Sequence, residues 1–127
     1  AQPGWLDATS DIDPAGWLIS REASRGKAIK AEEADIIKAS IANAAKIFKE
    51  DPRMIANRAV QLEVMLDPTD DRETAVWLVE VLADVVREPG KVEGFGAIGQ
   101  QYFNLRKAGL SERAALDDLS RRYRSRG

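Results

Sequence analysis

The chain has 127 residues, of which 44% are hydrophobic and 31% charged, and it contains no histidine and no cysteine. The two absences exclude Ser-His and Cys-His nucleophilic sites, histidine general bases and the usual zinc and haem ligand sets, so we expect no cofactor and no metal ion. A formal net charge of -2 argues against general binding to polyanions, and the length suits one globular domain.

Three Asp-Pro dipeptides, at residues 13–14, 51–52 and 67–68, are the clearest helix signals. An Asp at the N-cap accepts a hydrogen bond from a free backbone amide, and Pro at the next position needs no partner for an amide hydrogen. The third dipeptide competes with Asp70 and Glu73, which have capping-box spacing, so it is expected to be a linker. The first dipeptide predicts a short helical turn over residues 14–20.

Apolar residues recur with a helical period in three successive segments, residues 28–50, 52–66 and 72–87. The third segment is the most apolar. Its many β-branched residues could indicate a strand, but its length and the spacing of its charged residues favour a helix. Trp77 stands among valines in this segment and is expected to be buried.

Glu88-Pro89-Gly90 ends this third segment, and a further helix is predicted from Gly94 or Phe95 to Ala108. Gly109 is expected in a left-handed conformation just after that helix. Ser111 is the expected N-cap of a last helix, which ends in a frayed, arginine-rich segment.

The expected fold is therefore an all-α single domain, with four main helices plus a short N-terminal helix in a bundle. The domain spans residues 1–127. Residues 1–27 form an N-terminal extension that contains the short helix, and residues 28–125 form the helical core.

The longest candidate for a membrane span, residues 74–86, is interrupted by Glu80 and Asp84 and is too short. The chain begins with Ala1 rather than Met, which we interpret as the product of signal-peptide cleavage. We therefore expect a periplasmic or secreted protein. The alternative is a cytoplasmic domain excised from a longer chain.

Residues 94–99 read GFGAIG and match the dinucleotide-binding pattern GxGxxG. The context differs from that of a dinucleotide fold, because no buried strand precedes the motif and no second strand follows it. The glycines are better explained by a tight helix entry or by a close contact between two helices.

Oxygen-bearing side chains alternate at residues 7–13 and again at 67–71, as in a calcium loop. Both runs lack the glycine at position six and the bidentate carboxylate at position twelve. They are therefore interpreted as capping and turn-forming residues.

Glu80 and Asp84, one helical turn apart, are the best carboxylate pair for acid-base chemistry, and a hydrolase that uses them is one alternative function. Burial would raise the proton affinity of one of the two. Arg87 can pair with Asp84, however, so a charged stripe that faces water or a partner explains the same residues.

Residues 92–127 carry seven basic and four acidic side chains, whereas residues 51–91 carry five basic and nine acidic ones. The turn before Ser111 is similar to that of a DNA-binding helix-turn-helix, although its core positions fit poorly. Contact with nucleic acid through the C-terminal arginines is therefore a second alternative function.

The hypothesis that remains is a non-catalytic exported module that binds a protein partner or associates with itself. It depends on the missing catalytic residues, on the polarised charge and on Trp5 and Trp17, which could cover a groove or contact another chain. The candidate partner-binding residues are Trp5, Trp17, Glu80, Asp84, Arg121, Arg122 and Arg124.

Overall fold

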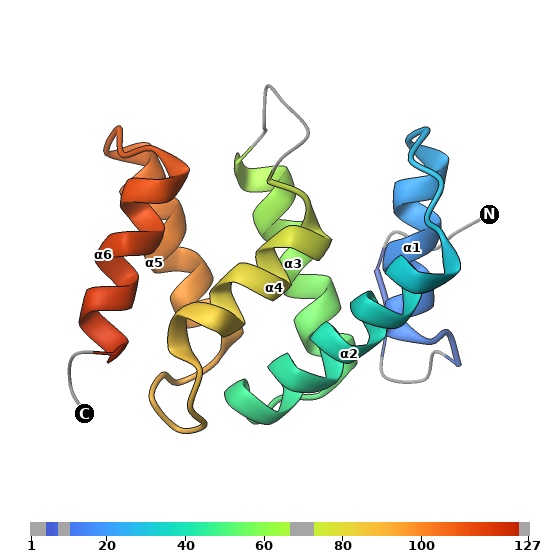
Figure 1. The fold of residues 1–127 in the computed structure, drawn as a ribbon, viewed down its shortest axis with the longest axis horizontal. Helices are drawn as coiled ribbons and strands as arrows, with labels where there is room; N and C mark the ends of the chain where they lie inside the picture. The colour runs from blue at the N-terminus through green and yellow to red at the C-terminus, as the bar shows by residue number, and fades with distance from the viewer. Residues whose placement is uncertain (1–4, 8–10, 67–72, 125–127) are drawn as a thin grey trace.

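The computed structural model describes residues 5–7, 11–66 and 73–124, and that part of the chain is helical without strands (Figure 1). The helices are α1 (Pro14–Ser24), α2 (Ala31–Phe48), α3 (Pro52–Leu66), α4 (Ala75–Val86), α5 (Phe95–Lys107) and α6 (Glu112–Arg124). The predicted all-α fold is confirmed. The described residues hold six helices, one at each of the six predicted segments, so the expected total of four main helices and one short helix was one too low. Helix α1, at 11 residues, is longer than a single turn.

The six helices form two layers (Figure 1). Helices α2, α4 and α6 lie side by side in the layer nearer the viewer, and α1, α3 and α5 lie behind them. Each front helix packs on the rear helix that precedes it in the chain, so the molecule is a row of three helical hairpins. Helix α4 is at the centre of this row, with α2 and α6 on its two sides. None of the helices in the described residues is long and apolar enough to cross a membrane.

Short polar side chains begin the helices where the sequence predicts them. Asp13 accepts a hydrogen bond from the backbone N–H of Gly16 at 3.0 Å, and Ser111 accepts one from Ala114 at 3.1 Å. Asp51, just before α3, accepts the amide two residues further on at 2.8 Å. These contacts span two or three residues, so local sequence is sufficient to specify them.

The start of α4 differs from the prediction. The helix begins at Ala75 rather than at residue 72, and Thr74 is its N-cap, with its hydroxyl accepting the Trp77 amide at 3.2 Å. Glu73 does not close a capping box but reaches across to α5, which is a long-range contact that the spacing could not indicate. The dipeptide at 67–68 and its proposed linker role lie outside the described residues.

The burial of two tryptophans, Trp17 and Trp77, differs from what the sequence predicted. Trp17 is 0% exposed and packs in the core, so the expectation that it covers a groove or contacts another chain is wrong. Arg21 lies over its ring at 6.0 Å. Trp77, which was expected in the core, is only partly buried.

Buried glutamates link helices that are distant in sequence. The Glu63 carboxylate on α3 accepts hydrogen bonds from Arg21 at 3.2 Å and Arg25 at 2.9 Å, both at the C-terminal end of α1. It also accepts the Ala75 amide at 2.7 Å, at the N-terminus of α4. A carboxylate at this position satisfies an amide that has no partner within the helix, and its charge suits the helix dipole.

Glu73 makes a similar link to α5. Its carboxylate accepts the Tyr102 hydroxyl at 2.6 Å and two Arg106 nitrogens at 3.0 and 3.1 Å. Burial and this hydrogen bond raise the pKa of Tyr102, and the same carboxylate raises the pKa of Arg106. Tyr102 is therefore a fixed, neutral hydrogen-bond donor.

The GxGxxG segment is a close helix contact, as its context indicated. A Cβ added at Gly96 would lie 2.8 Å from the Arg58 guanidinium of α3, and one at Gly99 would lie 3.4 Å from Leu62. At the start of α5, Glu50 accepts the backbone N–H of Phe95 at 2.7 Å. Glu50 thus supplies the negative charge that stabilises the N-terminus of α5.

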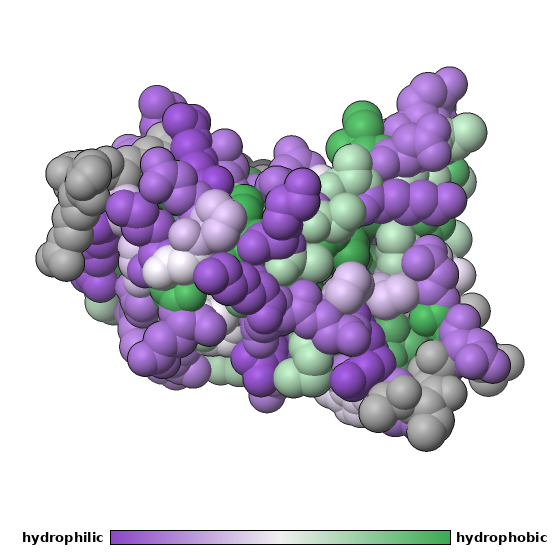
Figure 2. All heavy atoms as spheres, turned by 90° about the horizontal axis from the view of Figure 1, so that it is seen from below, coloured by the Kyte–Doolittle hydropathy of each residue, from purple (hydrophilic) through white to green (hydrophobic). Residues whose placement is uncertain are grey.

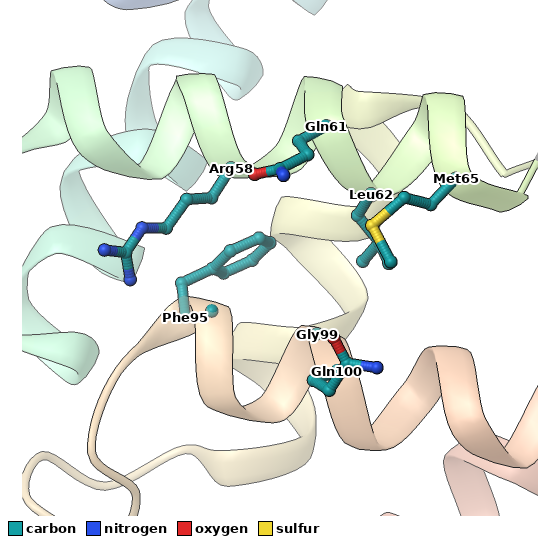
Figure 3. A pocket seen from close by; sticks show the side chains of 8 residues that line it. Arg58, Gln61, Leu62, Met65, Phe95, Gly99 and Gln100 are labelled. Carbon is teal, nitrogen blue, oxygen red and sulfur yellow. The ribbon is translucent and has the colours of Figure 1, made fainter.

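A small hollow of about 260 Å³ remains between α3 and α5 beside these glycines. Figure 3 shows its α3 wall, which includes Arg58, Gln61 and Met65, and its α5 wall, where the Phe95 ring points toward α3. Arg58, which lines this hollow, pairs with Glu50 at 3.1 Å. The hollow is therefore a packing feature with an internally paired cation.

Candidate functional site

A larger hollow of about 390 Å³ lies between α2, α4 and the segment that joins α1 to α2. We call it the α2/α4 groove. Its described lining residues are Glu22, Lys27, Ala28, Ile29, Glu33, Ile36, Ile37, Thr74, Val76, Trp77 and Glu80.

Apolar side chains form the walls of the α2/α4 groove. Ile36 on α2 is 57% exposed, whereas its neighbour Ile37 is buried. Ile29 and Val76, which line the same groove, are partly buried. Trp77 on α4 is held edge-on against the buried Tyr102 ring, with ring centroids 6.4 Å apart. The indole is thus fixed on its inner side and open to the groove on the other.

The polar lining of the α2/α4 groove is mainly acidic. Among the described lining residues, Glu22, Glu33 and Glu80 are carboxylates, and Lys27 is the single base. Glu33 and Glu80 are exposed, whereas Glu22 is only 4% exposed. The groove therefore joins an apolar wall to two exposed acids and one buried acid.

Glu22 differs electrostatically from the two exposed acids. Burial is the largest cause that raises its pKa above the ordinary value of 4.5, and the nearby Glu63 carboxylate raises it further. Lys27, Arg25 and Arg21 act in the opposite direction without cancelling the rise. A titratable group with a perturbed pKa in a cleft is typical of functional sites.

The structure places Glu80 in this groove but leaves Asp84 outside its lining. Both residues are exposed, so the burial on which the hydrolase alternative depended is absent. Asp84 pairs with Arg87 at 3.6 Å, as the spacing predicted. The pair is a charged stripe on the outer face of α4.

The C-terminal arginines lie on α6, away from the groove. Arg121 and Arg122 both pair with Asp118, at 3.6 and 2.9 Å, on the same helix. The two exposed cations are therefore partly neutralised by a neighbour one turn earlier. The side chain of Arg124 lies outside the described residues.

Trp5 is 55% exposed and does not line the groove. The next residue, Leu6, is attached to α3, because its N–H donates to the Asn57 side chain at 2.9 Å and its carbonyl accepts from that side chain at 2.6 Å. The predicted partner-binding residues are thus not brought together at one site.

Figure 2 shows how apolar surface is distributed on one face of the molecule. Hydrophobic residues gather toward the end that carries α1 and α2, and the end that carries α6 is predominantly hydrophilic. Exposed Ile36 belongs to the α2 end.

Comparison with known protein families matches residues 15–124 to the model of the MoxZ family. The chain belongs to the MoxZ family. The matched region runs from α1 to the end of α6, so it includes all the described residues that line the groove in this MoxZ-family chain. No curated protein and no solved structure matches the chain.

The sequence did not assign Glu22, Ile36 or Trp77, which line the groove, to any site. Ile36 had a signal, because it stands beside Ile37 and falls off the buried stripe of its helix. Glu22 had none, since nothing near it in sequence indicates the burial of a carboxylate. Trp77 was misassigned because its valine neighbours indicated a position in the core.

Proposed function

We propose that this MoxZ-family protein is a non-catalytic accessory protein, associated with methanol oxidation, that binds a protein partner through the α2/α4 groove. The observation that carries the proposal is the combination of Ile36 and Trp77 at a hollow of about 390 Å³. An aliphatic and an aromatic side chain that face a groove are the kind of anchor that concentrates binding energy at an interface.

The exposed acids that border the groove indicate which side chains a partner should carry. Glu33 and Glu80 border the apolar wall, and Asp84 extends the acidic stripe along α4. A partner segment with apolar residues for the wall and basic residues for the rim is complementary to this surface. Such an apolar wall with a charged rim suits an amphipathic segment laid along two helices.

Family membership supports the accessory role, and the exposure of Glu80 and Asp84 supports a binding rather than a catalytic use of these acids. A general acid needs a raised pKa, which burial commonly supplies. The stripe instead meets solvent and can contact a second protein.

The test is affinity capture with the tagged chain from an extract of its source organism, followed by a measured affinity for the captured protein. Ile36→Asp removes the apolar anchor and places a charge on the wall, so we expect the affinity to fall at least about ten-fold. Val64→Asp is the matched control, because Val64 is 63% exposed on α3 in the other layer.

The proposal predicts a captured protein that Ile36→Asp loses and Val64→Asp retains. A partner that both variants lose equally, or retain equally, would show that the α2/α4 groove is not the binding surface. Circular dichroism of both variants checks that each is folded before the affinities are compared.

A further inference from the structure

We infer that the surface between α3 and α5 is a second docking site, and that its occupant is an acidic amphipathic helix of a partner protein. We call this surface the α3/α5 seam. It is formed by residues 58–66 of α3 and 95–107 of α5. The seam belongs to the other layer of the molecule from the α2/α4 groove, so the inference goes beyond the proposed function.

The first observation is that two hollows follow one another along the seam. The hollow of about 260 Å³ beside the α5 glycines and a second one of about 230 Å³ share Met65 as a lining residue. Met65 is 40% exposed and extends from α3 toward α5 (Figure 3). Because a methionine side chain is unbranched and adaptable, its rotation can join the two hollows. From Arg58 to Leu66 the joined surface follows α3 for roughly 12 Å, or about two helical turns.

The second observation is the chemistry of the lining. Leu62, Met65, Leu66 and Phe103 supply apolar contacts along the seam. The charged residues among the described lining residues of the two hollows are all basic: Arg58, Arg106 and Lys107. The lining is therefore apolar and basic, whereas that of the α2/α4 groove is apolar and mainly acidic.

The third observation is that the same charge extends over the helices of the rear layer. In α1, α3 and α5 the acids are Glu22 and Glu63, and both are buried. The charged residues of these helices that are not buried are all bases, namely Arg21, Arg53, Arg58, Arg106 and Lys107. Helix α4 of the front layer instead carries two exposed acids, Glu80 and Asp84, and no base. A partner that approaches the seam thus meets cationic side chains.

The internal ion pairs of the seam do not reverse this charge. The Glu73 carboxylate that binds Arg106 belongs to a residue only 3% exposed, while the Arg106 side chain is 28% exposed. The guanidinium is therefore the more accessible member of the pair. Lys107 is exposed, and its ammonium group lies 5.8 Å from the centroid of the Phe103 ring. A cation and an apolar ring are thus presented together at the end of the seam.

These features favour an acidic protein helix over other anionic partners. An amphipathic helix places apolar residues on one face and can carry carboxylates along the edges of that face. Its apolar face suits Met65 and Phe103, and its carboxylates suit Lys107 and Arg58. A nucleic acid would contact the bases but would leave the apolar lining without a complementary surface.

The experiment uses the full chain with carbon-13 in the methionine methyl groups. The chain has two methionines, Met54 and Met65, so NMR gives two signals. Met54 lies on the same helix but lines neither hollow, which makes it an internal control. The probes are two amphipathic peptides of about four helical turns. Both have leucine on one face, and the other face carries glutamate in one peptide and lysine in its counterpart.

We expect the glutamate peptide to shift the Met65 methyl signal and to leave Met54 nearly unchanged, and the lysine peptide to shift neither. Lys107→Glu should weaken the binding of the glutamate peptide at least about five-fold. Lys46→Glu is the matched control, because Lys46 is an exposed lysine on α2 and its reversal changes the net charge equally. We expect it to change the affinity by less than about two-fold.

The comparison of the two peptides needs only the wild-type protein. A Met65 signal that the glutamate peptide does not move, or that the lysine peptide moves equally, would overturn the inference. So would equal weakening by Lys107→Glu and Lys46→Glu. A shift of Met65 by an oligonucleotide of deoxythymidine at the same concentration would show that the seam recognises polyanions rather than a protein helix. The proposed function is judged separately, by the dependence of the captured partner on Ile36.

Discussion

Glu22 is a residue whose environment opposes its usual charge. In the folded protein it must ionise at 4% exposure and near Glu63, whereas in the unfolded chain it is in water. Its pKa is therefore higher in the folded state than in the unfolded state. A carboxyl whose pKa is higher in the folded state than in the unfolded state lowers the free energy of unfolding at pH values where it is ionised.

The sign of this effect gives a pH prediction. Below the unfolded pKa, Glu22 is neutral in both states, and as pH rises through the folded pKa the buried charge lowers the free energy of unfolding. Glu22→Gln stays neutral throughout, so we expect it to gain stability relative to wild type between pH 4 and pH 7. Urea unfolding at pH 4 and pH 7 measures the free energy of unfolding of the variant and of wild type. A variant that is less stable relative to wild type at pH 7 than at pH 4 would contradict the prediction.

At the scale of single helices, α4 shows how the fold is held together. Its N-terminus receives the Thr74 side chain from its own segment and the Glu63 carboxylate from α3. Glu63 also binds two arginines of α1, so one side chain connects three helices. This junction fixes the segment that carries Trp77 into the groove.

Glu63→Ala tests this junction. The Glu63 side chain is 5% exposed, and its loss leaves the Ala75 amide and two guanidinium groups without this acceptor, so we expect a loss of about 3 kcal/mol in the free energy of unfolding. The arginine side chains are 23% and 35% exposed, which lets water compensate them in part. Urea unfolding provides the value.

Glu33→Ala is the control for that measurement, because Glu33 is an exposed acid on α2. An exposed substitution of this kind changes stability by about 0.5 kcal/mol or less. If Glu63→Ala were no more destabilising than Glu33→Ala, the junction would contribute nothing to the fold.

At the scale of the whole molecule, the three hairpins share one core rather than three separate ones. Buried side chains form a continuous cluster that extends from Trp17 on α1 to Leu119 on α6. A continuous core favours cooperative unfolding of a domain of this size. The two layers also determine the surface, since one hollow lies between the neighbouring helices α3 and α5 and another between α2 and α4.

Leu119→Ala tests whether α6 unfolds together with the rest. Leu119 is 0% exposed, and a fully buried Leu truncated to Ala loses about 3 kcal/mol on average. No tryptophan lies in α6, because the three are at positions 5, 17 and 77. We therefore expect far-UV circular dichroism and tryptophan fluorescence to give the same, lower midpoint; an earlier loss of helix signal would show that α6 melts alone.

The amino-acid sequence by itself determined the class of fold and the ends of most helices. Asp13, Asp51 and Ser111 cap helices where they were expected, and Gly109 has the predicted left-handed φ of 104°. These features depend on contacts within a few residues, which the order of side chains is enough to specify.

Only the tertiary structure decided which side chains are buried and which form a site. Trp17 enters the core and Trp77 opens to a groove because α2 and α4 approach each other there, and α1 supplies Glu22 to the same place. Residues 22 and 77 are far apart in the chain, and no local periodicity reports their proximity. Burial and the pKa shift that follows from it are properties of packing between helices, so they emerge only when the layers assemble.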